Sequence, residues 1–138
     1  MKDKAQSIAL HIIIAAAISL ILIWANIQYR QWSQYTTGEQ ALKRGDVIAA
    51  ISAYDAAIHM YTPFSPLIER SAERLWQLGQ AFEQRGERER ALLAYRSLRS
   101  SFYAVRWLVS PGTGWIAKCD TRIASLVPPV QQAPQPRP

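Results

Sequence analysis

The 138-residue sequence is poor in cysteine and histidine, with only Cys119, His11 and His59. A single cysteine cannot form an intrachain disulfide, and these three side chains do not have the close pairwise spacing of a zinc site. We therefore expect no disulfide, no metal site and no cofactor. Cys119 lies at helical spacing from apolar residues, which predicts a position in the core.

The sequence also lacks the short motifs of common enzyme classes. It has no P-loop, no G-x-G-x-x-G, no G-x-S-x-G, no H-E-x-x-H and no paired cysteines. Neither histidine has a spacing that would pair it with a nucleophile. We therefore expect a protein that is not an enzyme and has no small-molecule substrate.

Charged residues are missing from residues 8–27, IALHIIIAAAISLILIWANI. At about 1.5 Å per residue, a helix of this length covers roughly 30 Å, the thickness of the hydrocarbon core of a bilayer. Aromatic residues gather around its C-terminal end, as they do at membrane interfaces, namely Trp24, Tyr29, Trp32 and Tyr35. We predict a transmembrane helix over 8–27, preceded by a short tail over 1–7.

Lys2 and Lys4 precede this segment, so a cleaved secretory signal is an alternative. The apolar run is long for a signal peptide, and no convincing cleavage site follows it, which favours an uncleaved signal anchor. The two lysines also favour a cytoplasmic N-terminus. We expect a single-pass protein of the inner or plasma membrane with its domain outside the cytoplasm, in the periplasm if the cell has one.

Small side chains within the segment allow close packing of another helix, with Ala15 and Ser19 four residues apart. Ordinary apolar composition is the alternative explanation. His11 lies about a turn inside the boundary, where it either reaches the interface, hydrogen-bonds to a partner helix or takes part in proton transfer. We assign His11, Ala15 and Ser19 to transmembrane packing.

Proline is absent between residues 5 and 45, and Gly38 is the only glycine within that stretch. Because nothing there breaks a helix, we expect the transmembrane helix to continue into the first helix of the following domain. A continuous helix would hold that domain in a defined orientation against the bilayer.

The formal net charge is +6, and most basic residues after the span are arginines. Several share a segment with Glu83, Glu87 and Glu89, so a solvated helix face with intrahelical ion pairs is the favoured interpretation. Attraction to anionic membrane lipid is the alternative. We expect no nucleic-acid partner.

Two stretches, GDVIAAISAY (45–54) and GERERALLAY (86–95), align without a gap at a distance of 41 residues. Apolar residues continue from each at steps of three and four, and a second helical pattern precedes each glycine. Each unit therefore predicts a helix, a short glycine turn and a second helix. The predicted fold class is all-α.

The pattern resembles the tetratricopeptide repeat, a helix–turn–helix unit whose usual period is about 34 residues. We place two copies within 28–109, at about 31–63 and 66–109. Pro63 explains part of the longer period by ending a helix before Ser65, a predicted N-cap, and Pro66. The signature positions are Gly38, Gly45, Ala50, Tyr54, Ala57, Gly79, Phe82, Gly86, Ala91 and Tyr95.

The resemblance implies that the first helix of each copy lines a concave, partner-binding face. Trp76 is the leading candidate for contact with a partner. The alternative is that it packs under the extension of its own helix or against Phe64. The positions implied are Tyr35, Glu39, Lys43, Glu73, Trp76, Gln80, Glu83 and Gln84.

After the break at SPGTG (110–114), apolar residues at helical spacing predict a capping helix over 115–127, because repeat arrays need a terminal helix over their last apolar face. The Pro- and Gln-rich end, 128–138, predicts a flexible tail, with a docking peptide as the alternative.

Two functions fit this organisation. The first is a scaffold or accessory subunit of a larger membrane complex, whose protein partners are integral membrane subunits. The second is a membrane-tethered adaptor that captures soluble clients in the repeat groove. The small residues of the span and the rigid junction favour the first.

Overall fold

The computed structural model describes residues 2–107 and 109–127, and this part of the chain has five helices and no strand. The helices are α1 (Lys2–Lys43), α2 (Val47–His59), α3 (Pro66–Gln84), α4 (Arg88–Ala104) and α5 (Thr113–Leu126). The all-α prediction is confirmed for these residues. The tail predicted at 128–138 lies outside them.

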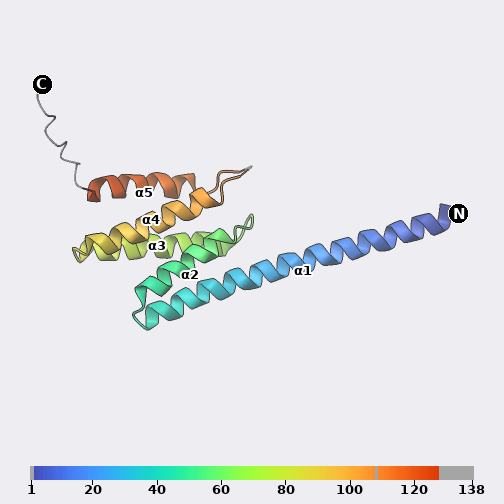
Figure 1. Cartoon of the computed structure of the whole chain (residues 1–138), viewed down its shortest axis with the longest axis horizontal. Helices are drawn as coiled ribbons and strands as arrows, with labels where there is room; N and C mark the ends of the chain where they lie inside the picture. The colour runs from blue at the N-terminus through green and yellow to red at the C-terminus, as the bar shows by residue number, and fades with distance from the viewer. Residues whose placement is uncertain (1, 108, 128–138) are drawn as a thin grey trace, which may run out of the picture.

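The first helix, α1, is continuous over its 42 residues. It begins at Lys2, so residues 2–7 extend the helix instead of forming the separate tail that we expected. The uninterrupted junction between the apolar segment and the domain is confirmed. Figure 1 shows the N-terminal half of α1 projecting beyond the other helices, while its C-terminal part packs beside α2.

The C-terminal part of α1 and the helices α2 to α5 form a bundle in which each helix turns back on the one before (Figure 1). The main contacts join α1 to α2, α3 to α4 and α4 to α5, with α2 also packed on α3 and α4. The core contains the completely buried side chains of Tyr54, Ile58, Leu75, Tyr95, Leu98, Phe102 and Cys119.

The turns after α1 and α3 have the same geometry. Gly45 and Gly86 have φ of 77° and 73°, the left-handed conformation that glycine adopts without strain after a helix. In each turn the next N–H donates to a carbonyl five residues earlier, Asp46 to Ala41 and Glu87 to Phe82, both at 2.9 Å. The two aligned sequence stretches therefore fold into matching turns.

The connection from α2 to α3 follows the prediction in one respect and corrects it in another. Pro66 occupies the first turn of α3, directly after Ser65. Ser65 occupies the predicted N-cap position of α3, but its side chain makes no capping bond; its hydroxyl donates instead to the amide oxygen of Gln31 on α1. The competing acceptor on a neighbouring helix overrides the local capping preference.

The last helix starts two residues before the predicted 115–127 and ends one residue before it. Ile116 and Cys119 are its buried residues, and α5 packs on α4. The predicted core position of Cys119 is confirmed.

Candidate functional site

Half of the residues expected to bind a partner make contacts inside the bundle. Tyr35, Glu39, Trp76 and Glu83 are half-buried, and each contacts a neighbouring helix. Of the other four residues, Gln80 is half-buried, while Lys43, Glu73 and Gln84 are exposed.

Glu39 joins three helices. Its carboxylate accepts a hydrogen bond from the Tyr54 hydroxyl on α2 at 2.6 Å. Arg74 on α3 donates to both carboxylate oxygens, from Nε at 2.7 Å and from a terminal nitrogen at 2.8 Å. Paired donation of this kind fixes the geometry as well as the charge balance. Glu39 thus connects the first helix pair to the second.

Glu83 has the corresponding role one helix pair later. It accepts a hydrogen bond from the Tyr95 hydroxyl on α4 at 2.9 Å and one from Arg122 on α5 at 3.3 Å. The carboxylates of α1 and α3 therefore each bind the tyrosine of the next helix and an arginine of the helix after that.

These contacts shift the pKa values of the groups involved. Burial raises the pKa of Glu39, but the hydrogen bonds from Tyr54 and Arg74 outweigh it and hold the pKa below its usual value of 4.5. Burial and the neighbouring carboxylates raise the pKa of Tyr54 and Tyr95 well above the usual 10.0. Both tyrosines therefore remain hydrogen-bond donors at neutral pH.

Aromatic rings cover the same two tyrosines at positions 41 residues apart. Tyr35 lies 5.8 Å from the ring of Tyr54, and Trp76 lies 5.1 Å from that of Tyr95, both tilted by more than 50°. Trp76 also packs against Trp115 of α5, with 6.1 Å between ring centroids. Trp76 does not pack against Phe64, which is fully exposed.

Gln31 joins α1 to the rest of the domain, and it is not among the predicted site residues. Its side chain is completely buried, and its amide nitrogen donates to the carbonyls of Ala57 and Met60, both at 3.1 Å. Its amide oxygen accepts from Ser65. One side chain therefore satisfies the C-terminal end of α2 and the start of α3. A polar residue at a helix-facing position just beyond the apolar segment was the available signal.

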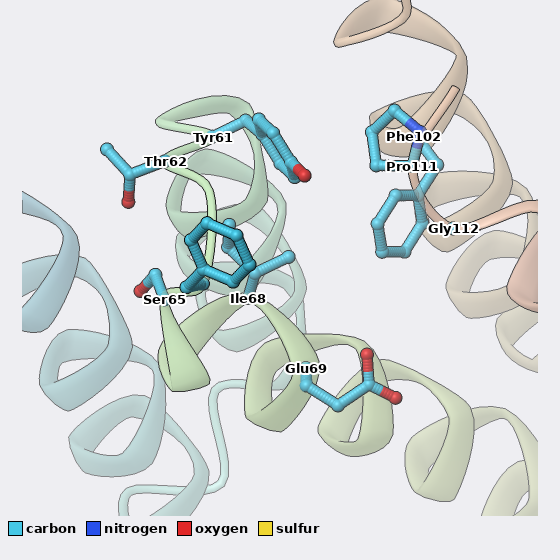
Figure 2. A pocket seen from close by; sticks show the side chains of 9 residues that line it. Tyr61, Thr62, Ser65, Ile68, Glu69, Phe102, Pro111 and Gly112 are labelled. Atoms are coloured by element: carbon cyan, nitrogen blue, oxygen red, sulfur yellow. The ribbon is translucent and has the colours of Figure 1, made fainter. Parts of the chain in front are cut away.

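A hollow of about 290 Å³ opens between the α2–α3 loop and the segment before α5. Figure 2 shows Tyr61 and Ile68 on one side and Phe102 and Pro111 on the other. A second hollow of about 240 Å³ also uses Tyr61, together with Val105, Trp107 and Val109.

Two polar residues of the apolar segment, His11 and Ser19, are bonded within α1. His11 Nδ1 lies 2.6 Å from the Ser7 carbonyl, and the Ser19 hydroxyl donates to the Ala15 carbonyl at 2.9 Å. Residues 8–26 of the apolar segment are exposed, and Ile27 is half-buried. In the described residues, α1 is the one helix long and apolar enough to cross a membrane, judged by length and composition.

The arginines are paired between helices more than within them. Arg90 pairs with Glu87 in the first turn of α4, as the intrahelical interpretation predicts. Arg74, Arg99 and Arg122 pair with carboxylates on other helices. The prediction of intrahelical pairs therefore describes one ion pair and misses the interhelical ones, which depend on the packing of the bundle.

No group of three His, Cys, Asp or Glu side chains that could hold a metal ion occurs among the residues described by the structure. Burial raises the pKa of Cys119 to about 12, so its thiol stays protonated and unreactive at neutral pH.

Comparisons with protein-family models, with curated proteins and with solved structures found no match to this chain.

Proposed function

We propose that this protein is a non-enzymatic, membrane-anchored scaffold or accessory subunit of a larger membrane complex. The supporting observation is the continuity of α1, whose apolar segment runs without a break into the helix that carries Gln31. Because Gln31 is fully buried and hydrogen-bonded to α2 and the α2–α3 connection, the domain turns with α1 as one body. A rigid attachment suits a subunit that must hold partners at a set position above the membrane.

We further propose that the domain is a two-repeat, tetratricopeptide-like unit. The support is the agreement between its two helix pairs: Gly38 packs on Tyr54 as Gly79 packs on Tyr95, and the turns at Gly45 and Gly86 share their hydrogen bonds. The helix α5 then takes the role of the terminal cap.

The contacts of Glu39, Trp76 and Glu83 affect where a protein partner would bind. These side chains already hold helices of the domain together. The polar residues around them therefore remain available to contact a protein partner. In this proposal the exposed Lys43, Glu73 and Gln84 contact the partner at the domain.

Within the membrane, α1 would contact the integral membrane subunits through its small residues. The Ser19 hydroxyl is bonded to the α1 backbone and does not need a polar partner, whereas His11 is bonded through Nδ1 alone and keeps its second ring nitrogen for a polar group of a partner helix. The surface around Ala15 and Ser19 would pack against a partner helix through shape complementarity, because small side chains allow close approach. Lys2 and Lys4 support a cytoplasmic N-terminus, with the domain on the other side of the membrane.

The test is recovery of partners in mild detergent with three tagged baits, followed by mass spectrometry. The baits are the full chain, a chain that begins at Trp24, and the full chain with a six-residue Gly/Ser insertion between Ile27 and Gln28. The insertion keeps the anchor and the domain but removes their rigid connection.

A scaffold subunit predicts integral membrane partners with the full chain, fewer with the insertion and none with the shortened chain. Soluble partners that are equally abundant with all three baits would contradict the proposal and identify a membrane-tethered adaptor.

A further inference from the structure

Three large apolar side chains stand out from the domain into solvent. Phe64 is fully exposed, Trp107 is 89% exposed and Val109 is 65% exposed. Among the described residues outside α1, these are the three most exposed large apolar side chains. Single exposed apolar residues are common on protein surfaces, but two aromatic rings and a valine at loop tips need a separate explanation. We call Phe64, Trp107 and Val109 the loop-tip surface.

The loop-tip surface lies at one end of the domain. Phe64 belongs to the α2–α3 loop, and Trp107 and Val109 belong to the α4–α5 loop. Because α2 and α4 run back from the opposite end, both loops lie at the end from which α1 projects (Figure 1). Tyr61 lines one hollow with Phe64 and Pro111 and another with Trp107 and Val109. Figure 2 shows Tyr61 and Pro111 on opposite sides of the first hollow, so the two loops lie side by side.

Hydrogen bonds show which residues of α1 lie beside this end of the domain. Thr62 donates to the amide oxygen of Gln28 at 3.1 Å, and Gln31 holds Met60 and Ser65. The α2–α3 loop is therefore level with residues 28–31, immediately beyond the apolar segment at 8–27. If α1 crosses the bilayer, the loop tips meet the membrane–water interface.

The backbone at Phe64 has an unusual conformation. Phe64 has a φ of 66°, the only positive φ of a non-glycine residue in the described part of the chain. A bulky residue is rare in this conformation, and Phe64 gains no burial from it. The ring of Phe64 lies in solvent at the edge of the hollow, at the end of the domain from which α1 projects.

We propose that the loop-tip surface inserts into the interface of the lipid bilayer and gives the domain a second membrane contact beside α1. This inference rests on the proposed function, in which α1 spans the membrane. Trp and Phe rings favour the interfacial region, where the apolar body of the ring is removed from water. Arg30 and Arg106, both exposed and next to this end, would lie among the headgroups.

The test places a fluorescent probe at single positions of the full chain in liposomes that contain lipids with nitroxide-labelled acyl chains. Cys119→Ala provides a cysteine-free background, and the NBD-labelled cysteines replace Phe64, Trp107, Leu20 and Arg85. Leu20 reports on the span, whereas Arg85, exposed at the α3–α4 turn, reports on the opposite end of the domain. Quenching shows contact with acyl chains.

We expect severalfold stronger quenching at Phe64 and Trp107 than at Arg85, and the strongest quenching at Leu20. Quenching at Leu20 with Phe64 and Trp107 equal to Arg85 would overturn the inference and leave the anchor intact; a protein partner would then be the occupant of these loops. No quenching at Leu20 would overturn the membrane-spanning role of α1 and the inference together.

A second measurement shows that the aromatic rings cause the contact. With the probe at Val109, the pair Phe64→Asp and Trp107→Asp is expected to reduce quenching to the level seen at Arg85. The matched control is the pair Ile48→Asp and Leu93→Asp, which removes exposed apolar residues from α2 and α4. Equal quenching in the two double variants would contradict the inference.

Discussion

At the scale of single residues, two glycines set the distance between paired helices. A Cβ at Gly38 would lie 2.6 Å from Cε1 of Tyr54, and one at Gly79 would meet the Tyr95 ring in the same way. Real Cβ atoms do not approach so closely, so the tyrosine would have to move. Its hydroxyl is held by Glu39 in the first pair and by Glu83 in the second, which leaves little freedom to do so.

Gly38→Ala is therefore expected to reduce the free energy of unfolding by about 1–2 kcal/mol, because overpacking outweighs the better helix propensity of alanine. The measurement is chemical unfolding in detergent. Gly114→Ala is the control, since nothing lies within 4 Å of that Cβ, and it is expected to be neutral or slightly stabilising. A Gly38→Ala protein as stable as the Gly114→Ala protein would contradict the close packing on Tyr54.

Glu39 predicts a pH dependence of stability. Its pKa is lowered in the folded protein, so its stabilising contribution is complete above the unfolded value of 4.5 and is lost as the pH falls through the lower folded value. Glu39→Gln is expected to lower the Tm at pH 7, and the difference from wild type should shrink below about pH 4.5. Melting curves from pH 7 to pH 3 measure this effect.

Glu73→Gln, at an exposed position of α3, is the matched control for this series. It should follow the wild-type Tm at each pH. A difference between wild type and Glu39→Gln that stays constant down to pH 3 would show that the Glu39 contacts do not depend on its charge.

At the scale of the helices, the attachment of α1 is the decisive feature. Its apolar half is exposed, whereas the part from Gln31 to Ala41 supplies buried residues to the bundle. Gln31 is the first of these, and its three hydrogen bonds reach both ends of the α2–α3 connection. Gln31, together with Gly38 and Glu39 further along α1, therefore holds the domain in its orientation relative to the apolar segment.

Gln31→Ala is expected to destabilise the domain by about 1–3 kcal/mol, because two carbonyls and a serine hydroxyl lose their partner in a buried position. Gln40→Ala, at an exposed position of the same helix, should change the stability by less than about 0.5 kcal/mol. Urea unfolding of both variants compares them. Equal effects of the two substitutions would show that the Gln31 hydrogen bonds do not stabilise the junction.

At the scale of the whole molecule, α5 completes the core that the helix pairs leave open. Its own residues Ile116 and Cys119 are buried against the helix pairs. Trp115 packs on Trp76, and the Nε1 of Trp115 donates to Glu69 at 2.9 Å. The same helix pairs with α3 and α4 through Arg122 and Asp120. The contacts of α5 therefore reach both helices of the second pair.

Ile116→Ala is expected to lower the free energy of unfolding by about 2–5 kcal/mol and to shift the tryptophan emission to the red as Trp76 and Trp115 become more exposed. Val127→Ala makes a similar truncation at an exposed position just after α5, where we expect less than about 0.5 kcal/mol. An unchanged emission spectrum with Ile116→Ala would show that α5 does not depend on this contact.

The helices could be predicted from the sequence because their signals are local. The three- and four-residue apolar spacing, the glycines at 45 and 86 and the absence of proline before Gly45 predicted the all-α fold and the unbroken α1. Boundaries were less accurate: α1 begins at Lys2 and α5 at Thr113, because helix ends depend on weak local preferences. The tetratricopeptide resemblance and the partner-binding role remain predictions.

The tertiary structure decided how the polar and aromatic residues are used, because their partners lie far away in the sequence. Glu39 looked like a free recognition residue until α3 placed Arg74 beside it, 35 positions later. Gln31 and Ser65 are 34 positions apart, and no local pattern indicates that they bond. Phe64 and Trp107 also lie at the same end of the domain only because α2 and α4 run back in the same direction. The sequence alone determined which segments are helical and which segment suits a membrane; the packing of those helices determined which side chains hold the domain together and which remain exposed to contact something else.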